Sequence, residues 1–459
     1  MNRAVVPADL DALVAAVGAA LDGDGPPVAP VPLLPRPQGS GPTSGDVPAG
    51  TALVLRTSGS TGAPREVLLG ADALRASGAA THERLGGPGH WLLTLPPTHV
   101  AGVQVVARAH AAGRGLTVAP AGEPFTPGGF AALVARAPRG ERRYVSLVPT
   151  QLHRLVEAAD AGSADGTAGL DALRSLDAVL LGGAATPPAL LRRARSAGAR
   201  VVTTYGMTET CGGCVYDGVP LPGARVRLVP AGDTEGEEAG EGAGVVELSG
   251  PFLAHGYLGE PDATAAAFRT DDDGTRWFRT SDLGRLDGPA DAPVLTVLGR
   301  ADDVIVTGGV NVAPAAVEAV VGEVAGVGEA CVVGVPHPEW GQEVVAVVTL
   351  AGAPHDDGAA AGTSGTVSTA GTAGTAGTAG AVSTVGTAGT ASTVGAGGVT
   401  SAPPELVAAV RGRVADRLER AAAPRRVLVV PDLPRRGPGK VDRAAVARIA
   451  VGHGRTPPG

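Results

Sequence analysis

The feature that most constrains the fold is an alternation of short apolar runs with amphipathic stretches from Thr51 to about Leu248. The runs have the length of strands, and the stretches between them have the length of helices. This spacing predicts a mainly parallel α/β sheet with helices on both faces, because parallel neighbours need a crossover connection. The expected strands are 52–56, 91–95, 115–119, 144–148, 178–181 and 200–204, and the expected helices are 72–85, 100–112, 149–159 and 187–197.

The length of 459 residues predicts more than one domain, because a single compact core rarely grows so large. We expect a helix (9–21) and linker within residues 1–50, a large domain over 51–300 that includes a small β-rich subdomain, and a smaller, mobile α+β C-terminal domain over 301–459. A tract of Gly, Thr, Ala and Ser over about 351–402 repeats GTAG and predicts a disordered insertion. The C-terminal strands are expected at 303–306, 330–335 and 344–350, and its helices at 314–324 and 403–420.

Composition excludes several classes of protein. The net charge of −8 argues against a general nucleic-acid-binding protein, and no apolar run reaches the roughly 18–20 residues that a membrane span needs. The N-terminus does not resemble a signal peptide. Three cysteines cannot form a disulfide framework, and the Cys211–Cys214 pair lacks the further ligands of a zinc site, so small residues in a loop are the favoured interpretation. A cytoplasmic protein is expected.

Basic residues are distributed very unevenly between two types. Of 37 such residues 36 are arginine, and only Lys440 is lysine. An ammonium group is a compact point charge that can sit between two oxygens where a planar guanidinium cannot. The solitary lysine therefore indicates a functional role that requires an ammonium group and that an arginine could not fill.

A loop rich in Ser, Thr and Gly follows the first expected strand of the large domain. It reads Thr57-Ser58-Gly59-Ser60-Thr61-Gly62-Ala63-Pro64-Arg65. Its N–H and O–H groups can converge on one anion, to which Arg65 adds positive charge. The spacing differs from that of nucleoside triphosphatase loops, and a simple surface turn is the alternative.

Further polar motifs follow later strands, at the edge where open α/β sheets bind ligands. Thr204-Tyr205-Gly206-Met207-Thr208-Glu209 offers a flat ring, a hydroxyl and a carboxylate suited to Mg²⁺. Gly183 and Ala184 are small enough for a planar ring to approach, although tight structural turns would read the same way. Three later stretches carry further charged residues. Acidic residues and an arginine occur in Thr280-Ser281-Asp282-Leu283-Gly284 and Gly299-Arg300-Ala301-Asp302-Asp303. The lysine occurs in Pro438-Gly439-Lys440.

In this order and spacing the motifs resemble those of the adenylate-forming superfamily, which comprises acyl-CoA synthetases, adenylation domains and luciferases. The resemblance runs from about Leu53 to Arg443. It implies ATP, Mg²⁺ and CoA as cofactor and co-substrates, and a carboxylic acid as the partner substrate. It leaves a homodimer open.

The resemblance implies a role for each matching residue. Lys440, Thr208 and Glu209 would be catalytic, with Glu209 on Mg²⁺, Asp302 would be the hinge of the C-terminal domain, and Gly308 and Gly309 would flank the CoA tunnel. ATP and AMP would be bound by Thr57, Ser58, Gly59, Ser60, Thr61, Gly62, Arg65, Gly183, Ala184, Thr204, Tyr205, Asp282 and Arg300.

The acid is indicated by two stretches, Leu95–Gly102 and Cys211–Leu221, that resemble the o-succinylbenzoate–CoA ligases of menaquinone biosynthesis. By this likeness the acyl pocket would involve His99, Gly102, Met207, Gly212 and Gly213. Arg108 is a candidate for the second carboxylate of such a substrate, with a solvent-facing arginine as the alternative.

Two departures from the family pattern keep other interpretations open. The loop ends in Pro64-Arg65 where Pro-Lys is usual, and the stretch before the loop is short. A CoA ligase for another aryl or fatty acid, a non-catalytic adenylate-binding homologue, and an adenylation domain that loads a separate carrier protein are the alternatives.

Overall fold

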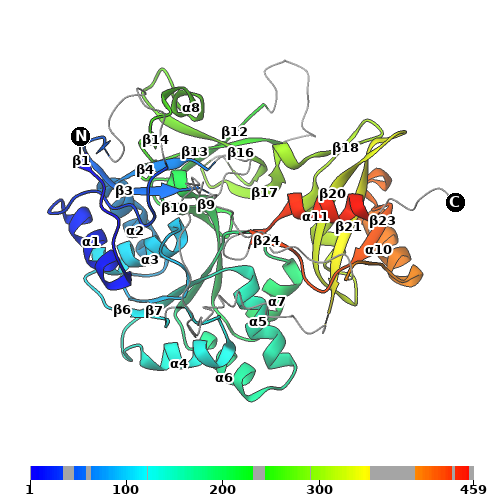
Figure 1. Ribbon diagram of the computed structural model, residues 1–459, viewed down its shortest axis with the longest axis horizontal. Helices are drawn as coiled ribbons and strands as arrows, with labels where there is room; N and C mark the ends of the chain where they lie inside the picture. Colours follow the sequence, from blue (N-terminus) through cyan, green and yellow to red (C-terminus); the bar gives the residue numbers. More distant parts are fainter. Residues whose placement is uncertain are drawn as a thin grey trace, which may run out of the picture.

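The computed structural model describes residues 2–34, 46–57, 64–120, 122–230, 243–289, 291–351, 398–436 and 440–453. Most of the Gly/Thr-rich tract and part of the expected linker lie outside these residues. Figure 1 shows a large part, coloured blue to green, beside a smaller C-terminal part, coloured yellow to red. Within the described ranges, no helix is long and apolar enough to cross a membrane.

The large part is built on a seven-stranded sheet in the order β11-β10-β9-β8-β7-β5-β6. Strands β5 to β9 run parallel, and β10 and β11 extend one edge in antiparallel fashion. The predicted parallel sheet is confirmed, and its last parallel strand continues three residues further than expected. The strands are β5 (His90–Leu93), β6 (Leu116–Val118), β7 (Arg143–Leu147), β8 (Ala178–Leu181), β9 (Val201–Met207), β10 (Gly212–Tyr216) and β11 (Val219–Pro220).

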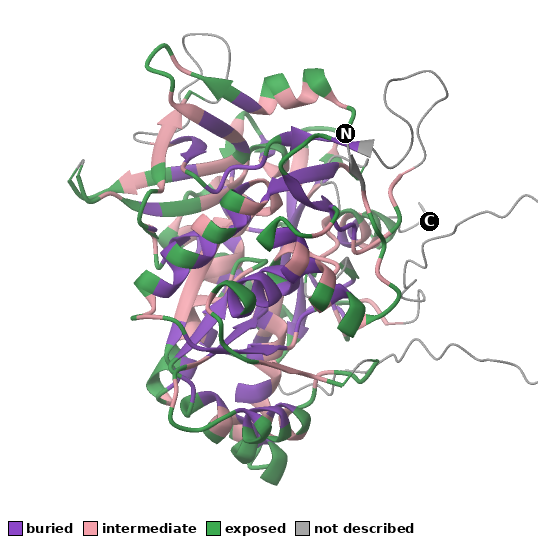
Figure 2. Ribbon diagram, turned by 90° about the vertical axis from the view of Figure 1, so that its left-hand side faces the viewer, coloured by how far each residue is buried: buried purple, intermediate pink, exposed green. Residues whose placement is uncertain are grey.

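Helices cover both faces of this sheet because alternate strand residues point to opposite sides. Trp91 and Leu93 of β5 lie in one core, and Leu92 between them lies in the other. Figure 2 shows that buried residues gather in the interior of the molecule, whereas exposed residues lie on its outer loops and helix faces. The first core is covered by α1 (Leu10–Asp22), α2 (Ala71–Arg84) and α3 (Val100–Ala111), and the second by α4 (Pro127–Arg136), α5 (Pro149–Asp160), α6 (Ala164–Arg174) and α7 (Pro188–Ser196).

The strand expected at 52–56 forms, but it does not join the parallel sheet. As β3 (Thr51–Arg56) it pairs with β4 (Glu66–Gly70), and β4 pairs with β14 (Gly256–Tyr257), all antiparallel. The predicted β-rich region is confirmed as a five-stranded sheet beside this one (Figure 1). Its strands are β12 (Arg225–Val229), β13 (Ala243–Ser249), β15 (Phe268–Thr270), β16 (Arg276–Asp287) and β17 (Val294–Arg300), with α8 (Pro261–Ala267) nearby and a separate pair of β1 (Asn2–Arg3) with β2 (Asp46–Val47).

The C-terminal part is an α+β unit, as predicted. Its sheet runs β19-β18-β21-β23-β22, with β20 paired to β21, and apolar clusters lie on both faces. A hairpin of β24 (Arg435–Arg436) and β25 (Lys440–Val441) extends toward the centre of the molecule (Figure 1). The other elements are β18 (Ile305–Thr307), β19 (Val310–Val312), α9 (Pro314–Val321), β20 (Val327–His337), β21 (Gly341–Leu350), β22 (Thr400–Ser401), α10 (Pro404–Arg417), β23 (Arg426–Val429) and α11 (Arg443–Gly452).

Candidate active site

The centre of the site is the turn that joins β9 to β10. Tyr205 and Met207 lie within β9, and a short 3-10 helix (Thr208–Thr210) follows. The backbone of Gly206 has a φ of +157°, and a Cβ there would stand 2.1 Å from the Gly212 carbonyl oxygen, so only glycine fits. This turn presents Thr208 and Glu209 beyond the carboxyl end of the parallel strands.

Tyr205 and Asp282, predicted from motifs 77 residues apart, meet directly. The tyrosine hydroxyl donates to Asp282 Oδ2 at 2.7 Å. Burial, together with this carboxylate, raises the pKa of Tyr205 well above its usual value, so the hydroxyl remains a donor. Burial also raises the pKa of Asp282, while the hydrogen bond from Tyr205 and the charges of Arg300 and Lys440 oppose that rise.

Arg300 stands opposite Asp282 in the register of β16 with β17. Its guanidinium is held by Asp302, with Nε–Oδ1 at 2.6 Å and Nη2–Oδ2 at 2.7 Å. This hydrogen-bonded pair lowers the pKa of Asp302. The residue predicted as the hinge therefore anchors a predicted nucleotide-binding residue.

Glu209 is a half-buried carboxylate of the site. Burial raises its pKa, against which act hydrogen bonds that include one from Tyr257 and the charges of Arg65 and Lys440. The Tyr257 hydroxyl donates to Glu209 Oε1 at 3.1 Å. Arg65 lies over the Tyr257 ring, with 5.0 Å from its guanidinium carbon to the ring centroid, and pairs with Glu260 at 3.3 Å.

The two ends of the Ser/Thr/Gly loop are joined across the start of β4. Thr57 N–H donates to the Arg65 carbonyl at 2.8 Å, and Arg65 N–H donates to Thr57 Oγ1 at 3.2 Å. The predicted phosphate ligands between them, Ser58, Gly59, Ser60, Thr61 and Gly62, lie outside the described residues.

Lys440 reaches this site from the C-terminal hairpin. Its ammonium interacts electrostatically with Asp282, Glu209 and Arg300. Desolvation and Arg300 lower its pKa, and the two carboxylates act in the opposite direction. Burial lowers the pKa of His99, and the positive charge of Lys440 lowers it further. The solitary lysine thus interacts electrostatically with predicted catalytic, ribose-binding and acyl-binding residues.

The predicted adenine-binding residues lie at the ends of two adjacent strands. Gly183 and Ala184 follow β8 and are exposed, and Gly183 has a φ of +86°. Thr204 of β9 lies against the neighbouring Gly182, where a Cβ would be 2.3 Å from Thr204 Oγ1. The strand ends thus leave an open surface at the carboxyl edge.

Residues predicted for the acyl pocket gather where α3 meets β10. His99 precedes α3, and its Nδ1 lies 3.0 Å from the Thr98 hydroxyl. A Cβ on Gly212 would meet Gln104 Cγ at 3.6 Å, and one on Gly213 would meet Thr204 at 3.0 Å.

Gly102 has a packing function in addition to its predicted contact with the acid. A Cβ at Gly102 would stand 2.3 Å from the Pro96 carbonyl oxygen, so this glycine lets α3 begin close to the preceding loop. Its contact with the acid remains a prediction.

Arg108 is buried, which excludes the solvent-facing alternative. Only 4 % of the residue is exposed. Its guanidinium carbon lies 5.4 Å from the Trp91 ring centroid, Nη2 donates to the Tyr216 hydroxyl at 3.4 Å, and Nε has no hydrogen-bond partner. Among the described residues no carboxylate pairs with it, so a buried positive charge stands uncompensated.

Gly308 and Gly309 form the two-residue turn of the β18–β19 hairpin. Both have positive φ, +57° and +81°, which is the geometry that such hairpins favour. A Cβ on Gly308 would meet the Trp340 ring at 2.9 Å, whereas one on Gly309 would meet nothing within 4 Å.

The donor set fits a magnesium ion that is bound mainly by a substrate. No group of three His, Cys, Asp or Glu side chains able to hold a metal occurs in the described part of the chain. Glu209 Oε1 accepts from Tyr257, and this carboxylate is the group suited to a cation. Mg²⁺ commonly takes one or two carboxylates and completes its shell with phosphates and water.

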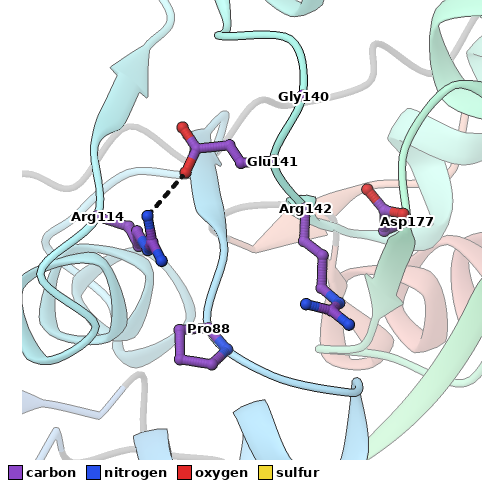
Figure 3. Close-up of a pocket in the computed structure, with 6 residues that line it drawn as sticks. All are labelled: Pro88, Arg114, Gly140, Glu141, Arg142 and Asp177. Atoms are coloured by element: carbon purple, nitrogen blue, oxygen red, sulfur yellow. Dashed lines mark ion pairs between the residues drawn. The ribbon is translucent and has the colours of Figure 1, made fainter.

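Two other features lie apart from this site. A polar depression of about 540 Å³ opens at the amino ends of the parallel strands, where Arg114 pairs with Glu141 at 3.7 Å (Figure 3). Cys211 and Cys214 are both buried free thiols, and burial raises the pKa of Cys214 to about 12. Neither feature brings together the polar groups that the motifs predicted.

Tyr257 and Gln104 were not foreseen from the sequence. Tyr257 comes from a strand far from the motif that contains Glu209, and Gln104 is one polar residue within the apolar first half of α3. Neither Tyr257 nor Gln104 belongs to a spaced motif. The sequence therefore offered no signal for them beyond their nearness along the chain to predicted residues.

Comparison with known proteins agrees with the motif order. Residues 10–258 match the AMP-binding enzyme family, and residues 316–368 match the AMP-binding enzyme C-terminal domain. A probable 2-succinylbenzoate–CoA ligase of Mycobacterium tuberculosis is 38% identical over 403 residues, covering 87% of this chain and 85% of that protein. An indoleacetate–CoA ligase of Aromatoleum aromaticum is 34% identical over 310 residues, covering 64% of this chain and 56% of that protein.

Among solved structures, the o-succinylbenzoate CoA synthetase of Bacillus subtilis in complex with its acyl-adenylate shares the fold. The TM-score is 0.60 at 24% identity, and the match covers 86% of this chain and 69% of that one.

Proposed function

Because the chain belongs to the AMP-binding enzyme family, we propose that it is an AMP-forming ligase that joins 2-succinylbenzoate to CoA in menaquinone biosynthesis. The observation that carries the proposal is the electrostatic interaction of Lys440, the only lysine, with both Asp282 and Glu209. A cation that interacts with a proposed ribose-binding carboxylate and a proposed metal-binding carboxylate is suited to a reaction between two anions. A cytoplasmic location is part of the proposal.

In the first half-reaction the acid attacks the α-phosphorus of ATP. A carboxylate oxygen–phosphorus bond forms as the bond to pyrophosphate breaks, and charge develops on the phosphoryl oxygens. Lys440 offsets the repulsion between the two anions, and the Thr208 hydroxyl donates to the α-phosphate. Asp282, one oxygen of which is oriented by Tyr205, accepts from the ribose hydroxyls.

The other end of ATP faces cationic and hydroxyl groups. Thr57, Arg65 and the loop between them would hold the departing pyrophosphate. When bound, Mg²⁺ neutralises part of the polyphosphate charge, and Glu209 is the residue that would hold it. Gly183, Ala184 and Tyr205 would enclose the adenine.

In the second half-reaction the CoA thiol attacks the acyl carbon, and the bond from that carbon to AMP breaks. Lys440 must leave to admit the thiol, so the C-terminal part would turn about Asp302 and bring the Gly308–Gly309 turn beside the pantetheine.

Arg108 supports a dicarboxylic substrate. A buried guanidinium without a carboxylate partner is costly unless an anion reaches it. The second carboxylate of 2-succinylbenzoate would supply that anion, with the acid entering past His99, Met207, Gly212 and Gly213.

The test is turnover with a defined set of substrates. The purified protein, ATP, MgCl₂, CoA and 2-succinylbenzoate should release AMP and pyrophosphate and form a thioester, with release dependent on the acid. No turnover with this acid would end the assignment of substrate.

A second candidate is a CoA ligase for another aromatic acid, which the relative that acts on indoleacetate favours. A monocarboxylate preferred over 2-succinylbenzoate by about tenfold in kcat/KM, or about 1.4 kcal/mol, would select this alternative. Failure of every acid to promote pyrophosphate release would instead favour a non-catalytic nucleotide-binding protein.

A further inference from the structure

Tyr257 connects two charged residues that come from different motifs. It lies in β14 opposite Val67 of β4, two residues from Arg65, and only 6 % of it is exposed. Its hydroxyl donates to Glu209 Oε1 at 3.1 Å, and its ring lies beneath the Arg65 guanidinium at 5.0 Å. One side chain therefore touches both the loop cation and the Glu209 carboxylate.

The segment around Tyr257 also holds the backbone of Glu209. Ala254 N–H donates to the Glu209 carbonyl at 2.8 Å, so the main chain and the side chain of Glu209 are both fixed by residues 254–257. The segment is itself rigidly placed. Gly256 has a φ of +146°, and Tyr257 N–H donates to Thr264 Oγ1 at 2.9 Å.

Arg65 makes this connection possible because of its shape. The family loop usually ends in lysine at this point, whereas a planar guanidinium can stack on an aromatic face and still pair with Glu260. The arginine at this position therefore keeps the positive charge and adds a contact to the Tyr257 ring.

We propose that Tyr257 is a positioning residue that holds the Glu209 carboxylate and the Arg65 guanidinium in one geometry for the metal-bound polyphosphate of ATP. This inference rests on the proposed function. The hydroxyl donates to Oε1 and orients the carboxylate for a cation, and the ring fixes the direction of the guanidinium. Tyr257 does not touch the reacting atoms.

The test compares ATP affinity with and without Mg²⁺ by calorimetry, in the absence of acid and CoA. Y257F keeps the ring and removes only the hydroxyl. We expect Y257F to lose about tenfold of the affinity gained from Mg²⁺, about 1.4 kcal/mol, while its affinity for metal-free ATP stays within about twofold of the wild type. The matched control is Tyr144→Phe, which removes a buried tyrosine hydroxyl that donates to the Leu85 and Gly87 carbonyls at the opposite end of the strands.

A purely structural role for Tyr257 predicts a different result. Equal loss of affinity with and without Mg²⁺, or no loss at all, would overturn the inference. Arg65→Lys gives a second route if Y257F is unstable, because it keeps the charge and loses the planar contact. It should likewise weaken ATP binding in the presence of Mg²⁺ more than in its absence. A wild-type protein that binds no ATP would refute the proposed function instead.

Discussion

Arg108→Met removes the charge from a buried cluster without leaving a large cavity, since methionine is also long and flexible. Arg108 contacts Trp91 and Tyr216 in this cluster, and its charge also acts on Cys211 and His82. Burial and the charge of Arg108 lower the pKa of His82 to about 4, so His82 is neutral at pH 7. Burial raises the pKa of Cys211, so it is a neutral thiol. Arg108 is therefore the charged group of this cluster.

The magnitude follows from the missing partner of Arg108. A carboxylate about 4 Å from the guanidinium gains about 4 kcal/mol at an effective dielectric constant of about 20. Desolvation of that carboxylate offsets part of this, and about 1.5–3 kcal/mol is typical for a hydrogen bond to a charged group. Arg108→Met should therefore reduce kcat/KM for 2-succinylbenzoate by about 10- to 150-fold.

The assay measures pyrophosphate release with two acids. The second acid is 4-oxo-4-phenylbutanoate, which is the same molecule without its ring carboxylate. Its kcat/KM should change by less than about threefold, because it has no group for Arg108 to bind. Removal of an unpaired buried charge should leave the free energy of unfolding unchanged or slightly increased. Equal losses with both acids, or a large loss of stability, would refute the reasoning.

Three other variants test the fold and its pH dependence. The pKa of His82 is about 4 in the folded protein and about 6.5 in the unfolded chain, so the stability contributed by its neutral form is fully present above pH 6.5 and is lost as the pH falls toward 4. Urea titrations should therefore show a loss of about 2 kcal/mol in the free energy of unfolding between pH 7 and pH 5. His82→Gln should abolish that part of the loss. Gly206→Ala should prevent the turn from forming, because its Cβ would collide with the Gly212 carbonyl, and circular dichroism should show a lowered Tm. Arg443→Met removes the guanidinium that lies 2.7 Å from the half-buried Glu318, which then keeps the Val332 N–H as a donor, and should destabilise the C-terminal part by about 1–3 kcal/mol in hydrogen exchange.

The positions of the strands along the chain and the polar motifs at their ends could be predicted from the sequence, but the sheet to which each strand belongs could not. The run at 52–56 has the same apolar composition as a parallel strand, but in the structure it pairs in antiparallel fashion with the next strand along the chain, β4. The local pattern of residues does not reveal which strands pair, because it specifies a strand and not its partner.

Helices α4 and α6 were missed because glycine is unfavourable in a helix interior. The structure explains their glycines by close packing. A Cβ on Gly166 would lie 2.2 Å from the Ala158 carbonyl, and one on Gly169 would lie 3.0 Å from Pro127. Tertiary contact therefore outweighs local propensity here.

Among the site residues, spaced motifs predicted those that now lie together, such as Tyr205 with Asp282. Single residues were harder to interpret. Arg108 could be read as a surface residue because an amphipathic pattern does not reveal which partner covers the far side of a helix. Tyr257 had no motif, and only the pairing of β14 with β4 brings it to Glu209.

The most direct test of the account separates the two half-reactions in Lys440→Ala. Formation of the acyl-adenylate from ATP and 2-succinylbenzoate in a single turnover should fall by about 10²–10³-fold or more, because the charge between the two anions is lost. Thioester formation from supplied acyl-adenylate and CoA should remain within about threefold of the wild type. Normal adenylation by this variant would contradict the central role of Lys440.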